Sequence, residues 1–337
     1  MGAPMNMGII GCGDFLRWMA PAIKKSSRVA VKSLFDPARE RSAKFADELG
    51  GTAVASADAI MNDPSIDIVC LFVPPWLRRP LAEEAARAGK HILATKPLAA
   101  SIEDAEAMVK ACSKVRMGVI YGRSGDGFSV MTHDLFASDE IGRLALYRQD
   151  WLHHYPQWNT WALDPVKNGG PFMDAMIHNL NLARYLMDRP VSGATFFSDN
   201  LAHPGLTCAD TEAMKVDFAG GGTAYLFITW AADLEVRSTD GNDREHIDVF
   251  YMVTDKGYRL TKEWRKEGAT LIASREGKTK SWTAKPPAGT LFDRFAEAVE
   301  QNSALPGDIV SAEMAAEDIR MLRTLEKQPG SRVPWNP

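Results

Sequence analysis

The chain has 337 residues, 45% of them hydrophobic and 24% charged, as in globular proteins built around an apolar core. Its formal net charge is −4 and it has no basic block, which argues against nucleic acid or an acidic membrane surface as a partner. No apolar run reaches the length of a membrane span, and residues 1–6 lack the features of a signal peptide. We therefore expect a cytoplasmic protein with two domains.

The cysteines indicate a reducing compartment. Their spacing is irregular and matches neither a metal site nor a disulfide framework, so we expect free thiols and no metal. The four residues are Cys12, Cys70, Cys112 and Cys208.

A glycine turn lies near the N-terminus, where an apolar run up to Ile10 leads into Gly11-Cys12-Gly13 and then into a helical pattern. A strand, a tight turn and a helix in this order let the backbone approach a pyrophosphate and direct unpaired helix N–H groups at it. Leu16 replaces the third glycine of the usual G-x-G-x-x-G pattern, so an ordinary strand-to-helix turn is the alternative. The cofactor contacts predicted here are Gly11, Cys12, Gly13, Asp14 and Phe15.

Asp36 follows the next predicted strand and lies 25 residues after Gly11, close to the usual place of a ribose-binding acid. A carboxylate there accepts the ribose hydroxyls and repels a 2′-phosphate, so it favours NAD over NADP. Arg39 and Arg41 follow closely and could accommodate that phosphate, so NADP stays an alternative. The structural alternative is that Asp36 only caps the helix predicted over 38–49.

Strands and helices alternate as far as residue 123, which predicts a parallel, doubly wound sheet. The strands are expected at 7–10, 29–35, 52–55, 66–73, 91–94 and 117–121, and the helices at 15–25, 38–49, 57–62, 81–88 and 101–113. Such sheets bind ligands beyond the C-terminal ends of their strands. The residues predicted at these ends are Gly11–Gly13, Asp36, Pro74-Pro75, Lys96 and Tyr121–Arg123, with Pro74, Lys96 and Arg123 among the cofactor contacts.

Beyond residue 123 the pattern changes to several strands joined by short turns, with Gly220-Gly221-Gly222 marking one hairpin. The strand predicted at 223–231 carries apolar side chains on both faces, so one face is expected to rest on a helix and the other on a second subunit. This pattern predicts a homodimer or homotetramer. The strands are expected at 144–152, 193–199, 211–218, 223–231, 246–254, 257–264, 268–274 and 279–283, and the helices at 128–137, 171–187, 290–301 and 309–325.

Lys96 precedes a proline, which restricts its backbone to an extended conformation and so fixes where its side chain points. At the end of a strand the ammonium would project into the cofactor crevice. A positively charged nicotinamide would lower its pKa, which suits a group that hydrogen-bonds a reacting hydroxyl. A solvated surface lysine is the alternative.

Asp174 and His178 are four residues apart on a predicted helix, so they share one face. A histidine can take the proton of a carbinol at neutral pH, and a carboxylate one turn away can orient it. Two alternatives are a helix-stabilising pair and half of a metal site, although no third ligand has fitting spacing.

Aromatic residues cluster before this helix. Flat rings with interleaved polar groups suit stacking against a sugar, although core packing explains some of them equally well. The cluster comprises Trp151, Tyr155, Trp158 and Trp161, and the predicted substrate contacts are Tyr155 and Trp158 together with Lys96, Asp174 and His178.

Six stretches together match one known family: Gly8–Gly13, Asp36-Pro37, Val69–Pro74, Ala88–His91, Lys96-Pro97, and Gly169-Gly170 with Asp174 and His178. They run in the family's order over nearly the whole chain. The chain resembles the glucose–fructose oxidoreductase / inositol dehydrogenase (Gfo/Idh/MocA) family.

This resemblance implies an N-terminal Rossmann domain over 1–123 and an α+β domain over 124–337 with a large, mostly antiparallel, open-faced sheet. Under this division the C-terminal helix is a candidate to pack back on the first domain. The resemblance also implies NAD(P)-dependent oxidation of a sugar, polyol or related alcohol. Lys96, Asp174 and His178 match the family's catalytic lysine, aspartate and histidine.

The chain departs from the family pattern at several places. Thr95 replaces the glutamate of Glu-Lys-Pro, which puts cofactor contacts there in doubt. Pro75 and Arg78 stand where asparagine and histidine are common, and Asn181 where an aspartate is common. Several of these positions border the expected pocket, so no substrate can be transferred from the best-known members.

The combined evidence predicts hydride transfer between nicotinamide C4 and a carbinol carbon. His178 would take the hydroxyl proton, Lys96 would polarise the same oxygen, and Asp174 would position the pair. One alternative is a hydrolase or isomerase that retains NAD and works by transient oxidation. Another is a non-catalytic, cofactor-sensing regulator.

Overall fold

The structure, a computed structural model, describes residues 3–123, 127–153, 160–231 and 248–335. The chain forms two compact units that do not follow chain order. The first unit comprises residues 1–125 and 287–319, and the second comprises 126–286 and 320–337. The chain therefore enters each unit twice.

The first unit is built on a seven-stranded sheet. Its strands are β1 (Met5–Ile10), β2 (Val29–Phe35), β3 (Thr52–Ala53), β4 (Ile68–Leu71), β5 (His91–Thr95), β6 (Met117–Ile120) and β15 (Val310–Ser311). They lie in the order β15-β6-β5-β4-β1-β2-β3, and every pair is parallel except β15–β6. The predicted Rossmann-type parallel sheet is thus confirmed.

Helices connect these strands, and two short 3₁₀ turns, η1 (Pro75–Leu77) and η2 (Cys112–Lys114), adjoin them. Ser101 begins α5 as predicted, since its hydroxyl accepts from the Asp104 N–H at 3.1 Å. The helices are α1 (Asp14–Lys25), α2 (Arg39–Leu49), α3 (Ala57–Met61), α4 (Arg78–Arg87), α5 (Ile102–Ala111) and α8 (Leu291–Glu300).

The helix predicted at 81–88 begins earlier, at Arg78, so that prediction was wrong at its start. Pro80 falls in the first turn, where a missing N–H costs no hydrogen bond. Helix α1 continues through Pro21 because Leu16, Ala20 and Ile23 share one buried face, and their burial offsets the lost backbone bond.

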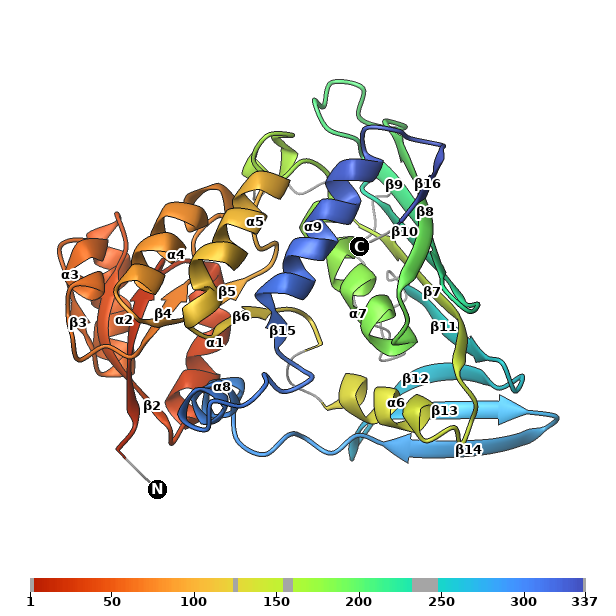
Figure 1. The fold of residues 1–337 in the computed structure, drawn as a ribbon, viewed down its shortest axis with the longest axis horizontal. Coiled ribbons are helices and arrows are strands. Elements are labelled where there is room, and N and C mark those ends of the chain that lie inside the picture. The colour runs from red at the N-terminus through yellow and green to blue at the C-terminus, as the bar shows by residue number, and fades with distance from the viewer. Residues whose placement is uncertain (1–2, 124–126, 154–159, 232–247, 336–337) are drawn as a thin grey trace. The chain divides into compact units, whose positions relative to one another are not determined.

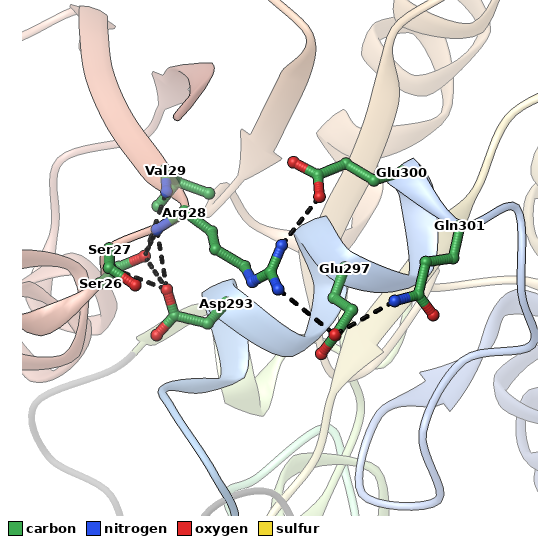
Figure 2. Close-up of polar contacts among 8 residues, drawn as sticks. All are labelled: Ser26, Ser27, Arg28, Val29, Asp293, Glu297, Glu300 and Gln301. Carbon is green, nitrogen blue, oxygen red and sulfur yellow. Dashed lines mark hydrogen bonds and ion pairs between the residues drawn. The ribbon is translucent and has the colours of Figure 1, made fainter. Parts of the chain in front are cut away.

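Helix α8 comes from the C-terminal part of the sequence, yet it lies beside α1 and β2 (Figure 1). The Asp293 carboxylate accepts from the Ser26 hydroxyl at 2.6 Å and from the N–H groups of Ser27 and Arg28 at 2.9 and 3.0 Å (Figure 2). Its other oxygen accepts from the backbone N–H and hydroxyl of Thr290 at 2.7 and 2.8 Å. One buried carboxylate therefore joins α8 to the turn before β2.

Arg28 adds a second link to the same helix. Its guanidinium pairs with Glu297 at 3.3 Å and with Glu300 at 2.8 Å (Figure 2). Both glutamates are partly exposed, so these pairs contribute little beside the Asp293 contacts.

Replacement of Asp293 by asparagine is expected to reduce the free energy of unfolding by about 2 kcal/mol at pH 7. Burial alone would raise the pKa of this carboxyl group, but hydrogen bonds from Ser26, Thr290 and Arg28 lower it to about 2. The charged form therefore stabilises the fold above about pH 4, and this contribution disappears as the pH falls through 2.

Denaturant titrations of both proteins at pH 7 and pH 3 measure this effect, and the difference should be about half as large at pH 3. Asp47→Asn, a change at an exposed position of α2, is the matched control and should have little effect. An Asp293→Asn deficit equal at both pH values would contradict the assignment.

The second unit holds a nine-stranded sheet in the order β14-β13-β12-β11-β7-β10-β9-β8-β16. Its pairs are antiparallel except β7–β10, which confirms the mostly antiparallel sheet. The strands are β7 (Leu144–Leu152), β8 (Val191–Asp199), β9 (Thr211–Phe218), β10 (Thr223–Thr229), β11 (Asp248–Thr254), β12 (Arg259–Arg265), β13 (Gly268–Arg275), β14 (Lys278–Thr283) and β16 (Arg332–Pro334).

The helical segments of this unit are α6 (Phe128–Ala137), the 3₁₀ turn η3 (Thr160–Leu163), the π-helical turn η4 (Phe172–Met176) and α7 (Ile177–Met187). Helix α9 (Ala312–Leu325) contains the point at which the chain passes from the first unit to the second.

The predicted hairpin is confirmed, because Gly220–Gly222 connects β9 to its antiparallel neighbour β10. On β10, Ala224, Leu226 and Ile228 are buried, and α7 packs against this strand as predicted. On the opposite face Tyr225 stays 39% exposed.

All four cysteines are free and buried. In the described part of the chain, no helix has the length and apolar character needed to cross a membrane.

Candidate functional site

The glycine turn of the first unit leaves a helix end open. Gly11 has φ +99°, and a Cβ there would collide with the Phe72 carbonyl, so glycine is required for this close approach. Gly13 is the N-cap of α1 and supplies no side-chain cap, and a Cβ at Gly13 would meet nothing within 4 Å. An uncapped helix N-terminus beside open space fits the diphosphate of a dinucleotide.

The residues that follow have local roles. The Asp14 carboxylate pairs with Arg17 at 2.7 Å on the surface, and the Phe15 ring packs edge-on against Phe72 with centroids 5.0 Å apart. Burial, with a contribution from Asp36, raises the pKa of the Cys12 thiol to about 12. Cys12 is therefore a protonated packing residue, and its side chain is 2% exposed.

The Asp36 carboxylate holds the glycine turn through hydrogen bonds within the protein. Its Oδ2 accepts from the Cys12 N–H at 2.8 Å and its Oδ1 from the Ala38 N–H at 2.9 Å. The carboxylate thus joins the glycine turn to the segment before α2, whose N-cap is Ala38. Each carboxylate oxygen can accept a further bond, so ribose binding by Asp36 stays a prediction.

Lys96 directly follows β5, and its N–H donates to the Ile120 carbonyl at 3.2 Å. The Lys96–Pro97 peptide bond is cis. Arg78 lies beside this turn: its guanidinium donates to the carbonyls of Pro97 and Leu98, and to that of Val73 at 2.7 Å. Arg78 therefore connects the segment after β4 to the segment that carries Lys96.

Arg78 is 2% exposed, and burial lowers the pKa of its guanidinium to about 9, which leaves it charged at neutral pH. The sequence showed Arg78 only as a departure from the family pattern. Its structural role was missed because the three carbonyls it contacts lie on two different loops.

The predicted first-unit contacts gather at one edge of the sheet. Gly11, Asp36, Pro74, Lys96 and Arg123 follow β1, β2, β4, β5 and β6, which are neighbours in the sheet. Their roles toward a cofactor remain predictions.

In the second unit, the helix predicted over 171–187 is interrupted, so that prediction was wrong in its first turns. Residues 172–176 form a π turn, and the α-helix begins at Ile177. Asp174 lies in the π turn and His178 in the α-helix. Both are partly exposed, whereas their neighbours Met173, Met176 and Ile177 are buried. Single π turns are frequent at functional sites.

Asn168 holds the Asp174 carboxylate. Its Nδ2 donates to Asp174 Oδ1 at 3.3 Å, and the Asn168 side chain is fully buried. The Arg323 guanidinium donates to the Asn168 carbonyl at 2.9 Å. Sequence reasoning missed Asn168, because an asparagine beside two glycines resembles an ordinary turn.

Glu212 was also missed. Its buried carboxylate accepts from the Phe172 N–H at 2.7 Å. One signal was present in the sequence. In the alternating pattern of β9, Glu212 falls on the same face as Met214, Val216 and Phe218, which form the buried side of the strand. A glutamate in such a series indicates a core carboxylate with a specific partner.

The predicted substrate contacts Tyr155 and Trp158 lie outside the described residues. Of the other two aromatics, Trp151 lies on β7 with its ring centroid 5.4 Å from that of His153, and Trp161 lies in η3. Among the described side chains, no three His, Cys, Asp or Glu residues are arranged to hold a metal ion.

Comparison with known proteins gives a consistent result. Residues 5–122 match a model of the oxidoreductase family with an NAD-binding Rossmann fold, and residues 130–242 match the GFO/IDH/MocA C-terminal domain. A 1,5-anhydro-D-fructose reductase from Ensifer adhaerens is 30% identical over 248 residues, which span 70% of this chain and 74% of that protein.

Two further proteins extend the comparison. A 2,7-anhydro-N-acetylneuraminate hydratase from Escherichia coli is 26% identical over 66% of this chain and 61% of its own length. The crystal structure of an aldose–aldose oxidoreductase from Caulobacter crescentus, complexed with glycerol, has a TM-score of 0.83 at 20% identity and covers 98% of this chain and 100% of its own. The chain belongs to the GFO/IDH/MocA family of oxidoreductases.

Proposed function

We propose that the protein is an NAD(P)-dependent oxidoreductase that transfers a hydride between nicotinamide and a carbinol carbon of a sugar or polyol. The observation that carries this proposal is the uncapped start of α1 at Gly13, with open space beside it, in a chain that also has Asp174 and His178 on the accessible side of one helix. The sugar reductase relative supports the substrate class.

The residues of the chain have separate roles in this proposal. The nicotinamide, when bound, supplies or accepts the hydride. His178 takes the hydroxyl proton, which a histidine can do near neutral pH. Lys96 polarises the same oxygen. Asp174, held by Asn168 at 3.3 Å, orients the histidine.

A second candidate function is suggested by the hydratase among the relatives. An enzyme of that kind would retain NAD and show no net reduction of the cofactor. A third is a regulator that binds the cofactor without turnover.

A substrate panel followed through the absorbance of the reduced cofactor separates these functions. In the direction of reduction, we expect NADH to be consumed with 1,5-anhydro-D-fructose. In the direction of oxidation, we expect NADH to form from NAD with the product of that reduction, or with D-glucose, D-xylose or myo-inositol. Product formation without cofactor reduction would support the retained-NAD mechanism. Cofactor binding without any product would support the regulator.

NAD is expected to bind more tightly than NADP, because the 2′-phosphate would meet the Asp36 carboxylate. Asp36→Ser should shift the preference toward NADP, with Arg39 free to pair with the phosphate. Fluorescence titration of wild-type and variant protein with both cofactors measures the ratio of the two Kd values. Arg39→Ser is the matched control and should not favour NADP. Tighter binding of NADP by the wild type would contradict this role of Asp36.

The second unit is expected to form a dimer or tetramer through its sheet. Tyr225 on β10 and Phe197 on β8 remain 39% and 49% exposed, and large exposed apolar side chains on a sheet favour association. Light scattering should return a mass at least twice that of the 37.1 kDa chain, and Tyr225→Asp should lower it. Trp18→Ser, at an exposed position on α1, should not. A wild-type mass of one chain would refute this expectation.

A further inference from the structure

The buried side of β9 carries one ionisable residue. Glu212 is 4% exposed and alternates with Met214, Val216 and Phe218, which are also buried. Removing a carboxyl group from water is unfavourable unless specific hydrogen bonds compensate. The buried Glu212 carboxyl group therefore requires a hydrogen-bond partner.

That partner is the first turn of the helix that bears Asp174 and His178. The Phe172 N–H donates to Glu212 Oε2 at 2.7 Å, and Phe172 is the first residue of the π turn. The N–H groups at a helix start have no acceptor within the helix. Glu212, 40 residues away in the sequence, supplies that acceptor from a strand.

Gly170 makes room for this contact. A Cβ at Gly170 would lie 3.1 Å from both carboxylate oxygens of Glu212, tighter than ordinary packing, and the φ of +100° also favours glycine. The Ser198 hydroxyl lies 3.5 Å from Oε1. A glycine at position 170 thus lets the Glu212 carboxylate reach the backbone at the start of the helix.

We propose that Glu212 is a positioning residue: it holds the first turn of the Asp174–His178 helix and so sets where these two side chains project. This inference rests on the proposed function for its catalytic consequence, and on the contacts above for its structural part.

The surroundings of Glu212 support a neutral, glutamine-like carboxyl group. Three ionisable groups interact electrostatically with it: Arg323 at the end of α9, Glu326 just after that helix, and Cys208 before β9. Burial raises the pKa of Glu212 to about 8. At pH 7 most molecules therefore hold a proton on one oxygen, and the other still accepts from Phe172.

Hydrogen–deuterium exchange at pH 7 tests the structural part without a substrate. In Glu212→Ala, amides of residues 172–176 should exchange at least tenfold faster, whereas in Glu212→Gln they should stay within about twofold of wild type. The shorter side chain in Glu212→Asp moves the acceptor away from the Phe172 N–H, so exchange at 172–176 should be intermediate between wild type and Glu212→Ala. This variant replaces Glu212→Ala in the test if the alanine variant does not fold. Met214→Ala, which removes packing from the same side of β9, is the matched control and should not speed exchange selectively at 172–176.

Steady-state kinetics on the best substrate of the panel test the catalytic part. Glu212→Ala should lower kcat at least tenfold with little change in the KM for the cofactor, and Glu212→Gln should restore kcat to within about threefold of wild type. If Glu212 affected kcat only through the packing of β9, Met214→Ala would lower kcat to the same extent as Glu212→Ala.

The outcomes separate this inference from the proposed function. Unchanged exchange in Glu212→Ala would overturn the inference, whatever the activity. Faster exchange with unchanged kcat would also overturn it, provided that His178→Asn is inactive. If His178→Asn is fully active, the proposed function fails, while faster exchange still supports the hold of Glu212 on the helix.

Discussion

Turnover of the His178→Asn variant is expected to fall by roughly a hundredfold to ten-thousandfold, the usual effect of losing a positioned acid–base group. Asparagine keeps much of the size and polarity of the histidine but cannot take a proton at neutral pH. The affinity for NAD should hardly change, because the predicted cofactor contacts lie on the first unit and His178 lies on α7 of the second. Steady-state kinetics, with cofactor binding titrated separately, measure both quantities.

His203→Asn is the matched control. The His203 ring lies 3.2 Å from the Asp210 carboxylate on the loop before β9, so its loss should alter local stability and leave turnover near wild type. Asp174→Asn should lower turnover less than His178→Asn if the carboxylate only orients its neighbour. Near-wild-type turnover in His178→Asn on the true substrate would refute the mechanism.

Lys96→Met is expected to lower turnover on a similar scale, roughly a hundredfold or more, and also to weaken cofactor binding. The ammonium would no longer polarise the reacting oxygen or border the nicotinamide. The backbone of the turn should persist, because Arg78 holds it through carbonyls that this change does not touch. Turnover and the Kd for NAD are the two measurements.

Lys90→Met is the matched control for Lys96→Met, because it also replaces a lysine ammonium with an uncharged side chain, at a buried position. The Lys90 ammonium donates to the carbonyls of Asp63 and Ile66 at 2.6 and 3.0 Å, so its replacement should reduce stability and leave turnover unchanged. Equal losses of turnover in Lys90→Met and Lys96→Met would show that Lys96 acts only through the fold.

The elements predicted correctly are those whose signal is local. The buried strand β4 is an uninterrupted apolar run, as parallel strands covered on both faces are. Ser101 caps α5 through a bond to a residue three positions away, and three consecutive glycines form the hairpin after β9. In each case the interacting groups are close in sequence, so the pattern itself contains the information.

The contacts that were missed join distant segments. The π turn at 172–176 cannot be distinguished from an α-helix by the spacing of its apolar residues. Its partner Glu212 is 40 residues away, and Asn168 is held by Arg323 across 155 residues. Arg78 contacts carbonyls 19 and 20 residues on. Every residue has a backbone carbonyl and every residue except proline an N–H, so no side-chain pattern marks which of these groups a buried polar side chain will bind.

The discontinuous first unit has a consequence for synthesis on the ribosome. Residues 1–125 emerge well before 287–319, although Phe292 and Phe295 complete their core and Val310 pairs with Val119 at the edge of the sheet. At usual rates of translation the intervening residues 126–286 take roughly 8 to 32 seconds to appear. During that interval the nascent sheet has an uncovered apolar face and an unpaired edge, the features that chaperones bind. A fragment that ends at residue 125 would keep both features permanently, so it is not a substitute for the whole cofactor-binding unit.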